Sequence, residues 1–325
     1  MSFGLNQVVG NYECLAIIDK PRAGVTYKVR NLATGELEAL RALPGAVARD
    51  PESTERLLRE IRVHTRLTHP NVVGFHDAFE LEGQLVMTTD YVDGGSLAQR
   101  CSDGPLSADE AVEIIFHVLL GLEEAHALGI VHRGISAEHV IVGRDAVVKL
   151  GGFDLAKPAS DTNLTKVGAV IGDPRYISPE QVIGKSDLDP RSDLYSVGVL
   201  LYLTLTGKMP FEGRNDFEVL SAQVSSIPQR PTELNPSLSP ELEQVVLRAL
   251  RKNPEERFAN ASEFRDALVA AANAPVAAAP VAERPAMAPL PVVRKSGARR
   301  FSAPVMVGFF ALVFGVVLAA WMMLH

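Results

Sequence analysis

The N-terminal third of the chain contains short runs of β-forming residues separated by turn residues. These runs predict strands over Val25–Arg30, Glu36–Ala42, Val72–Glu80 and Gln84–Tyr91, with the first two joined as a hairpin. A helix is predicted to begin with Asp50 as its N-cap and Pro51 in its first turn. One face of this helix carries Leu57, Ile61 and His64.

From about residue 105 the pattern becomes helical. Ser107 and Glu110 form a capping-box pattern that opens a helix running to Gly129. The segment Leu194–Thr206 is apolar on nearly every face, which predicts a buried central helix. Further elements are predicted as helices beginning at Ser239 and Asn260 and a small hairpin over His139–Val142 and Ala146–Leu150. A β-rich part followed by a larger helical part predicts a two-lobed α+β fold with a cleft between the lobes.

The segment Val305–Leu324 contains no charged residue and is long enough to cross about 30 Å of hydrocarbon as a helix. A buried core helix is the alternative, but it would not be expected after an Ala/Pro-rich stretch. Trp321 suits a membrane interface. Four cations precede the segment, namely Arg294, Lys295, Arg299 and Arg300. Because positive charge stays on the cytoplasmic side, we expect a single-pass membrane protein with a C-terminal anchor and residues 1–300 in the cytoplasm.

The C-terminal region is predicted to consist of a linker followed by a membrane anchor. Residues 272–300 are predicted to form an Ala/Pro-rich linker that ends in the basic juxtamembrane segment, and residues 301–325 to form the transmembrane anchor. Ala311, Gly315 and Ala319 recur at four-residue spacing, which lets two helices approach closely in lipid. Small residues are also common in membrane spans, so this stripe indicates either a homodimer or a plain tether.

Composition and charge narrow the classes of function. The chain has 325 residues, of which 47% are hydrophobic and 22% charged, and this balance allows a sizeable core. A net charge of −7 gives no reason to expect nucleic acid as a partner. Cys14 and Cys101 are far apart and lack a CxxC pattern, which excludes a disulfide framework and a cysteine zinc site.

Seven segments, in order, carry a resemblance to a known family. They read EIRVHTRLTHPNVVGFHDAFE, MTTDYVDGGSL, GIVHRGISAEHVIV, VKLGGFDLAK, GDPRYISPEQ, RSDLYSVGVLLYLTLTGKMPF and KNPEERF. In this order they resemble the eukaryotic-type serine/threonine protein kinases, especially the bacterial membrane-bound ones. The resemblance implies a kinase-like domain over residues 12–271, with a β-rich N-lobe over 12–88, a helical C-lobe over 93–271 and an N-terminal extension over 1–11.

The resemblance also assigns roles to single residues. Positions that face the nucleotide in the family are matched here by Gly24, Ala39, Arg41, Glu60, Thr89, Asp90, Val92 and Ile141. Positions that form the family's internal scaffold are matched by His132, Phe153, Asp193, Glu180 and Arg257. The chain is therefore expected to keep the fold and the adenine-facing positions.

Phosphoryl transfer needs phosphate clamps, a magnesium site and a base for the substrate hydroxyl. The family's glycine-rich loop, G-x-G-x-x-G-x-V, is matched by Asp19, Pro21, Gly24 and Thr26, so a single glycine remains. Arg41 replaces the family's phosphate-binding lysine, and its planar guanidinium differs from an ammonium. We expect Arg41 to pair with Glu60. The alternatives are that Arg41 contacts phosphate, or that the lysine is replaced by Lys20 or Lys28.

The family's catalytic loop, H-R-D-x-K-P-x-N, is matched by residues 132–139. Gly134 lacks the side chain of the base, Ser136 replaces a lysine, and His139 replaces a magnesium-binding asparagine. Gly152 stands where the family has its main magnesium ligand. Imidazole is a poor ligand for Mg²⁺, which prefers oxygen, so no metal site is expected. Two alternatives remain open, a substitute base at Glu138 and a cation ligand at Asp154.

These replacements lead to the hypothesis of a catalytically inactive pseudokinase. We expect a membrane-anchored signalling scaffold or nucleotide sensor, in which ATP binds weakly at most and Mg²⁺ is not required. The alternative is an atypical or weakly active serine/threonine kinase that uses ATP. Expected partners are other signalling proteins, the membrane and, through the anchor, a second copy of the chain.

Overall fold

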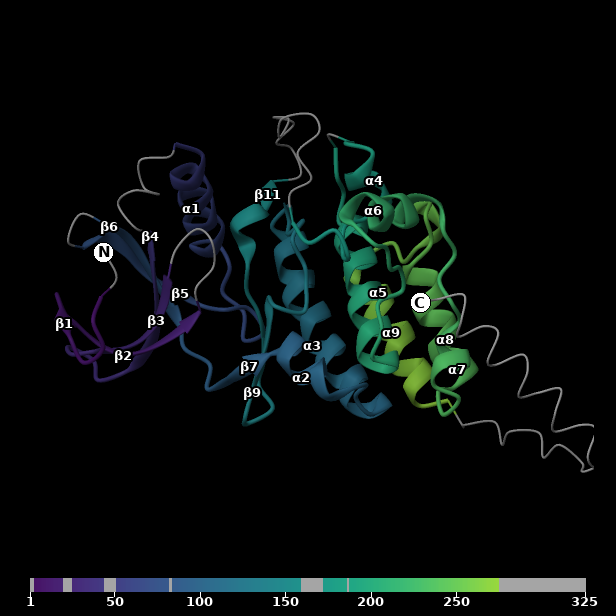
Figure 1. Ribbon diagram of the computed structural model, residues 1–325, viewed down its shortest axis with the longest axis horizontal. Coiled ribbons are helices and arrows are strands. Elements are labelled where there is room, and N and C mark those ends of the chain that lie inside the picture. Colours follow the sequence, from purple (N-terminus) through teal and green to yellow (C-terminus); the bar gives the residue numbers. More distant parts are fainter. Residues whose placement is uncertain are drawn as a thin grey trace, which may run out of the picture. The chain divides into compact units, whose positions relative to one another are not determined.

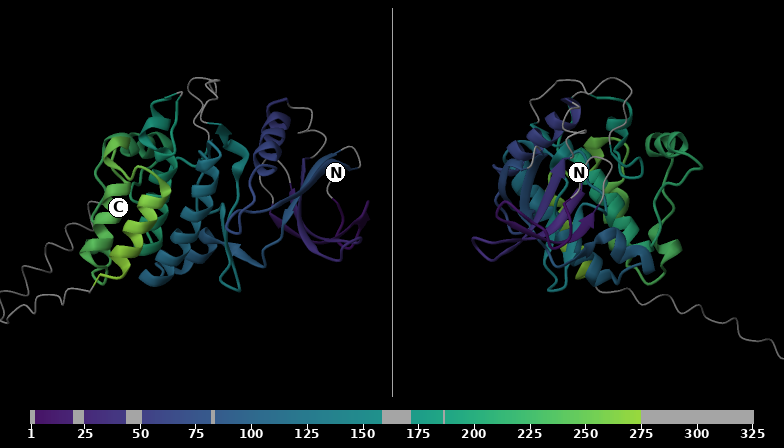
Figure 2. Two further views of the ribbon diagram at one scale, coloured as in Figure 1. Left: turned by 180° about the vertical axis from the view of Figure 1, so that it is seen from behind. Right: turned by 60° about the vertical axis from the view of Figure 1, so that its left-hand side comes forward.

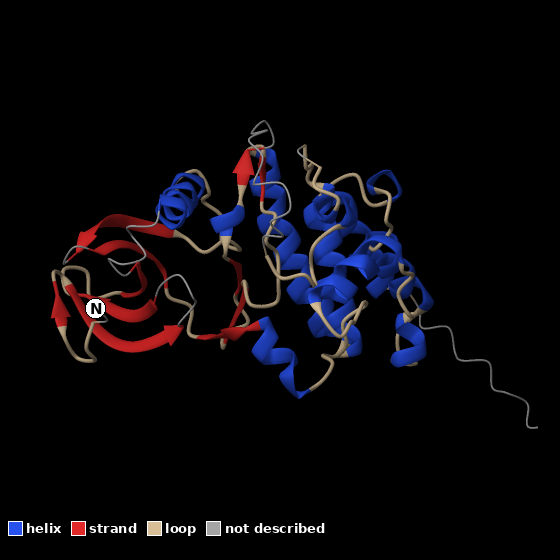
Figure 3. Ribbon diagram, turned by 45° about the horizontal axis from the view of Figure 1, so that its top comes forward, coloured by secondary structure: helices blue, strands red, loops and turns tan. Residues whose placement is uncertain are grey.

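The computed structural model describes residues 3–19, 25–43, 51–81, 84–158, 172–185 and 187–274. A curled antiparallel sheet and one helix form the N-terminal lobe (Figures 1 and 3). The strands lie in the order β1-β2-β3-β4-β6-β5, with bounds β1 Val8–Val9, β2 Tyr12–Asp19, β3 Val25–Asn31, β4 Leu37–Leu43, β5 Phe75–Leu81 and β6 Gln84–Asp90. Helix α1 spans Pro51–His64, which confirms the helix predicted to begin at Pro51.

Alternation along the strands buries one set of side chains of this sheet. Tyr27 and Val29 of β3 and Leu40 of β4 are almost fully buried. They pack into one apolar cluster with Cys14 and Val86 from the neighbouring strands. Strands β3 and β4 pair in antiparallel register, which confirms the predicted hairpin.

The first residues of the chain belong to the same lobe. Phe3 is buried in the apolar cluster, and its ring lies 5.4 Å from the ring of Tyr27. Its backbone N–H donates a hydrogen bond to the Tyr27 hydroxyl at 3.0 Å. Val9 pairs with Tyr12 and is also buried. Residues 3–11 thus pack on the sheet, although the sequence pattern set residues 1–11 apart as an extension.

Helices dominate the C-terminal lobe (Figure 2). The α-helices are α2 Leu97–Arg100, α3 Ala108–Ala127, α4 Pro179–Val182, α5 Arg191–Thr206, α6 Asp216–Ser225, α7 Pro231–Leu234, α8 Pro240–Ala249 and α9 Ala261–Ala272. Short 3₁₀ helices are η1 Cys101–Asp103, η2 Phe153–Leu155 and η3 Pro254–Glu256. Two small antiparallel sheets join β7 Gly94–Ser96 with β9 Val140–Gly143 and β10 Val148–Leu150, and β8 Ile130–Val131 with β11 Lys157–Pro158.

Helix α5 is the centre of this lobe. Nearly all its residues are buried, as its apolar sequence predicts. Gly198 allows α8 to approach closely, because a Cβ atom at this position would lie 2.7 Å from the Cβ of Ala249. The first turn of α5 carries Asp193, which is 1% exposed. Packing of α5 therefore holds a buried carboxylate in the interior of the lobe.

Two predicted details are wrong. The strand expected from Val72 begins at Phe75, because Val72 forms a bridge to Leu150 of the other lobe. Only one of the two hydrogen bonds of the predicted capping box at α3 is present. The Ser107 side chain accepts from the backbone N–H of Glu110, but the Glu110 carboxylate accepts from Arg100 Nε at 2.8 Å and does not return to the N-cap.

The predicted linker from residue 275, the basic segment, the anchor and the small-residue stripe lie outside the described residues, as do Lys20, Pro21, Gly24 and Asp50. The linker was predicted to begin at residue 272, but Ala272 is the last residue of α9. Within the described part of the chain, no helix is both long and apolar enough to span a bilayer.

Candidate functional site

The Asp193 carboxylate anchors the loop over residues 132–139 through hydrogen bonds to its backbone. The carboxylate accepts hydrogen bonds from the backbone N–H groups of His132 and Arg133, each at 2.8 Å, and lies 2.8 Å from Nε2 of His126. Burial opposes ionisation of Asp193, but hydrogen bonding and charge from His126 outweigh burial and keep its pKa below the usual range. Arg133 has a φ of 65°, a conformation that such anchoring can sustain. The scaffold role expected for Asp193 is thus visible in the geometry.

A cluster of three rings links α1 to this loop. The ring of Phe153 lies 4.4 Å from that of His132 and 5.3 Å from that of His64, measured between centroids. Nε2 of His132 lies 2.9 Å from the carbonyl oxygen of Gly151. The family resemblance placed His132 and Phe153 in the internal scaffold but gave His64 no such role. Its spacing four residues after Glu60, on the same helical face, was the available signal.

Burial of His64 makes the stability of this ring cluster depend on pH. The imidazole is 3% exposed, and burial lowers its pKa from 6.5 to about 4. Because the folded pKa lies below the unfolded one, the neutral ring stabilises the fold above about pH 6.5, and this contribution is lost as pH falls toward 4. At pH 5 the loss is expected to be on the order of 2 kcal/mol.

We expect His64→Leu to remove this component, since leucine fills a similar volume without a titratable group. Urea unfolding of wild type and variant at neutral pH and at pH 5 measures it. The wild type is expected to lose more stability on acidification than the variant. Equal losses in the two proteins would show that His64 does not titrate in this window.

The expected ion pair between β4 and α1 is present. Arg41 NH1 lies 2.7 Å from Glu60 Oε2, with the Glu60 side chain 4% exposed and the Arg41 side chain 24% exposed. Burial raises the pKa of Glu60, and Arg41 opposes this rise. The negative charge of Asp154 is a further neighbour that acts on both partners. Arg41 is thus engaged by Glu60 in a structural clamp, and Asp154 lies close to the same pair.

The loop itself lacks reactive groups where the family pattern places them. Gly134 carries no side chain, and a Cβ atom there would lie 3.0 Å from Cδ1 of Leu155. Ser136 Oγ lies 3.3 Å from Nδ1 of His139. Glu138, weighed above as a substitute base, accepts a hydrogen bond from Ser96 Oγ at 3.1 Å. The described residues also contain no group of three or more His, Cys, Asp or Glu side chains that could hold a metal ion.

The segment that joins the lobes is fixed through Asp90. Its carboxylate accepts from the Gly74 backbone N–H at 2.9 Å and pairs with Lys149 at 3.0 Å and His76 at 2.8 Å. Lys149 also donates to the carbonyl oxygen of Val72 at 3.2 Å. Burial opposes ionisation of Asp90, but the hydrogen bonds from His76 and Lys149 prevail and lower its pKa. The Asp90 side chain therefore holds the lobes together and is not free for a nucleotide.

Other residues expected to face an adenine come from both lobes. Ala39 of β4 and Thr89 of β6 are cross-strand partners in the N-terminal lobe. Ile141 of β9 pairs with Lys149 of β10 in the C-terminal lobe. Lys28, weighed above as a replacement lysine, has its Nζ 4.2 Å from the ring centroid of Tyr91. This cation–π contact engages the ammonium at the hinge.

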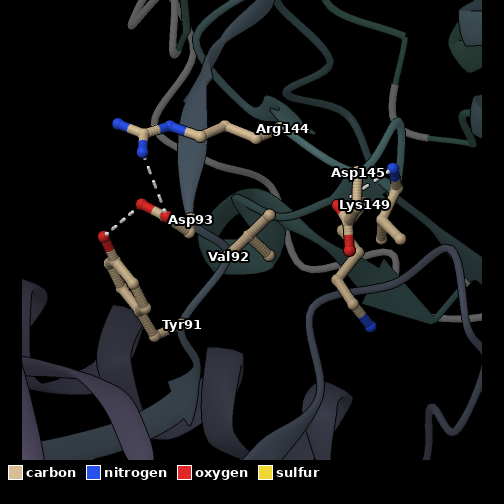
Figure 4. Close-up of a pocket in the computed structure, with 7 residues that line it drawn as sticks. Tyr91, Val92, Asp93, Arg144, Asp145 and Lys149 are labelled. Atoms are coloured by element: carbon tan, nitrogen blue, oxygen red, sulfur yellow. Dashed lines mark hydrogen bonds and ion pairs between the residues drawn. The ribbon is translucent and has the colours of Figure 1, made fainter.

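A cavity of about 370 Å³ adjoins this hinge (Figure 4). It is lined by Tyr91, Val92, Asp93, Arg144, Asp145, Val147 and Lys149. Among the described residues at predicted nucleotide-facing positions, Val92 alone lines it. Three of the charged side chains around it form ion pairs, Asp93 with Arg144 at 3.5 Å and Lys149 with Asp90 at 3.0 Å. The cavity thus overlaps with the predicted nucleotide-facing positions at Val92 and otherwise lies beside them.

The second scaffold contact predicted from the sequence lies deeper in the C-terminal lobe. Arg257 forms a two-pronged ion pair with Glu180, with NH1–Oε1 at 2.7 Å and NH2–Oε2 at 2.8 Å. The Arg257 side chain is fully buried and the Glu180 side chain is 6% exposed. This pair fastens α4 to the segment before α9.

Comparison with known proteins agrees with this arrangement. The profile of a family described as "Protein kinase domain" matches residues 12–268. The serine/threonine-protein kinase pkn3 of Myxococcus xanthus is 36% identical over 271 residues, which cover 80% of this chain and 49% of pkn3. The serine/threonine-protein kinase PknB of Mycolicibacterium smegmatis is 34% identical over 305 residues, covering 90% and 49%. The chain thus matches about half the length of these relatives.

A solved structure gives the same result for the fold. The crystal structure of the Mycobacterium tuberculosis PknI kinase domain aligns with a TM-score of 0.65 and 27% sequence identity. The alignment covers 83% of this chain and 99% of that domain.

Proposed function

The chain belongs to the protein kinase family, and from that premise we propose that it is a pseudokinase. The observation that carries the proposal is the contrast around Asp193. This carboxylate still fixes the backbone of His132 and Arg133 at 2.8 Å, while the next residue, Gly134, presents no group that could accept a proton. The scaffold for catalysis is kept, and its reactive side chain is absent.

The neighbouring positions support the same proposal. Transfer of a phosphoryl group requires charges that hold the nucleotide's phosphates and a base that orients the acceptor. Ser136 supplies no cation, and Arg41, which pairs with Glu60, offers a planar guanidinium where the family has a compact ammonium. The magnesium ion of the family does not fit here, because Gly152 and His139 offer no oxygen ligand at the two expected positions. Any ATP bound at the adenine-facing residues is expected to bind weakly and with nearly the same affinity with and without Mg²⁺.

Incubation of the purified whole chain with radiolabelled ATP and Mg²⁺ or Mn²⁺ tests the proposal. We expect no label on the chain itself or on a generic protein substrate. An Arg41→Ala variant, purified in parallel, controls for contaminating kinases. Label that appears with wild type and disappears with the variant would support the alternative, an atypical or weakly active kinase.

We further propose that the protein acts as a membrane-tethered scaffold or nucleotide sensor. The uncharged segment 305–324 and the cations before it support a C-terminal anchor with the kinase-like domain in the cytoplasm. A domain that keeps its fold without its chemistry can still present surfaces to other signalling proteins. The linker over 272–300 would then give the domain reach from the membrane.

A further inference from the structure

The side chain of His139 fills the space next to Gly152. A Cβ atom built at Gly152 would lie 2.4 Å from Cγ, 2.5 Å from Cδ2 and 2.6 Å from Nδ1 of the His139 ring. Real Cβ atoms essentially never come closer than 3.0 Å to such neighbours. Any side chain at position 152 would therefore have to displace the imidazole.

Hydrogen bonds hold the imidazole in this place. Nδ1 of His139 lies 2.7 Å from the carbonyl oxygen of Gly134. Because a carbonyl oxygen only accepts, Nδ1 carries the proton, and this nitrogen cannot serve as a metal ligand. The backbone is tied as well, with the His139 N–H donating to the Ser136 carbonyl at 3.1 Å and the His139 carbonyl accepting from the Gly151 N–H at 2.8 Å. The ring is thus fixed between the two segments that approach it.

We propose that the His139 side chain occupies the cation site of this fold, so that the side chains at 139 and 152 compete for the same volume. The inference rests on the proposed function and deepens it. The site would not merely lack ligands, because an imidazole occupies the volume that a carboxylate at 152 would need. A nucleotide at this site is then bound as a free anion, without a divalent cation.

This competition between the side chains at 139 and 152 predicts which substitutions can restore oxygen ligands for a metal ion. Gly152→Asp alone adds a carboxylate into occupied space, and His139→Asn alone opens the space but adds only an amide oxygen. The double variant supplies both oxygen ligands and removes the ring. Gly152 has φ of +75°, a conformation that aspartate tolerates better than most residues.

Binding of Mn²⁺ to the whole chain in the presence of ATP, measured from the electron paramagnetic resonance signal of free Mn²⁺, tests this. We expect the double variant to bind Mn²⁺ at least about tenfold more tightly than wild type or either single variant. Equal binding by Gly152→Asp and the double variant would overturn the proposal. A double variant that binds no better than wild type would also overturn it.

A second cycle tests the steric contact without any metal. Gly152→Ala is expected to lower the Tm, and by clearly less when His139 is also replaced by alanine. Gly184→Ala is the matched control, since Gly184 has φ of +73° but no atom within 4 Å of a built Cβ, so it reports backbone strain alone. If Gly152→Ala lowers the Tm no more than Gly184→Ala, His139 does not fill the space. Phosphoryl transfer by wild type would refute the pseudokinase proposal. The Mn²⁺ binding and Tm comparisons instead test whether His139 occupies the cation site.

Discussion

Replacing Asp193 by alanine is expected to destabilise the fold by at least about 3 kcal/mol, because three hydrogen-bond donors lose a buried anionic acceptor. The donors are the backbone N–H groups of His132 and Arg133 and the ring of His126, each 2.8 Å from the carboxylate. Each buried donor left without a partner costs about 1–3 kcal/mol, and hydrogen bonds to a charge lie at the upper end. The left-handed backbone of Arg133 would lose its restraint at the same time.

Urea unfolding of the whole chain, followed by far-UV circular dichroism, measures this loss. Asp266→Ala is the control, because the Asp266 side chain is 71% exposed and its contact with Arg265 is long, at 3.4 Å. We expect the control to change stability by less than about 0.5 kcal/mol. If Asp193→Ala behaves like the control, Asp193 does not anchor the 132–139 loop.

The second large effect is expected at the buried ion pair. Arg257→Ala should cost about 3–5 kcal/mol, since it leaves the Glu180 carboxylate buried without its partner. Arg257 also donates to the carbonyl oxygens of Arg251, Arg191 and Lys252, at 2.7, 2.9 and 3.0 Å. Burial opposes ionisation of Glu180, but the guanidinium more than compensates and lowers the pKa of this carboxyl. Without Arg257, burial is expected to dominate and to raise the pKa of Glu180.

An exposed ion pair serves as a control that separates the effect of burial from the effect of charge on stability. Arg214 pairs with Glu218 at 2.7 Å, but its side chain is 90% exposed, so Arg214→Ala should have an effect below about 1 kcal/mol. Unfolding free energies of both variants give the comparison. The double variant Arg257→Met/Glu180→Met should recover part of the loss, because apolar side chains leave no unpaired charge. Similar losses for Arg257→Ala and Arg214→Ala would contradict the scaffold role of the buried pair.

The sequence alone was sufficient for the two-lobed kinase fold and for the residue types that stand at the family's catalytic positions. Helix starts at Ser107, Ser239 and Asn260 could be predicted because a cap is a local hydrogen bond within a few residues. The absence of side chains at Gly134 and Gly152 is a property of residue identity, which no folding can change. The Arg41–Glu60 and Glu180–Arg257 pairs followed from the family resemblance, which carries long-range contacts that local patterns do not.

Only the tertiary structure decided what fills the space that those glycines leave. His139 and Gly152 are far enough apart in sequence that no local pattern relates them, and the fit of a ring against a missing Cβ is a matter of packing in three dimensions. For the same reason, no local pattern predicted the edge-on contact of His64 with Phe153 or the pairing of Asp90 with Lys149 and His76. Residue types show which groups are lost, whereas the packing of distant segments decides which neighbours take their place.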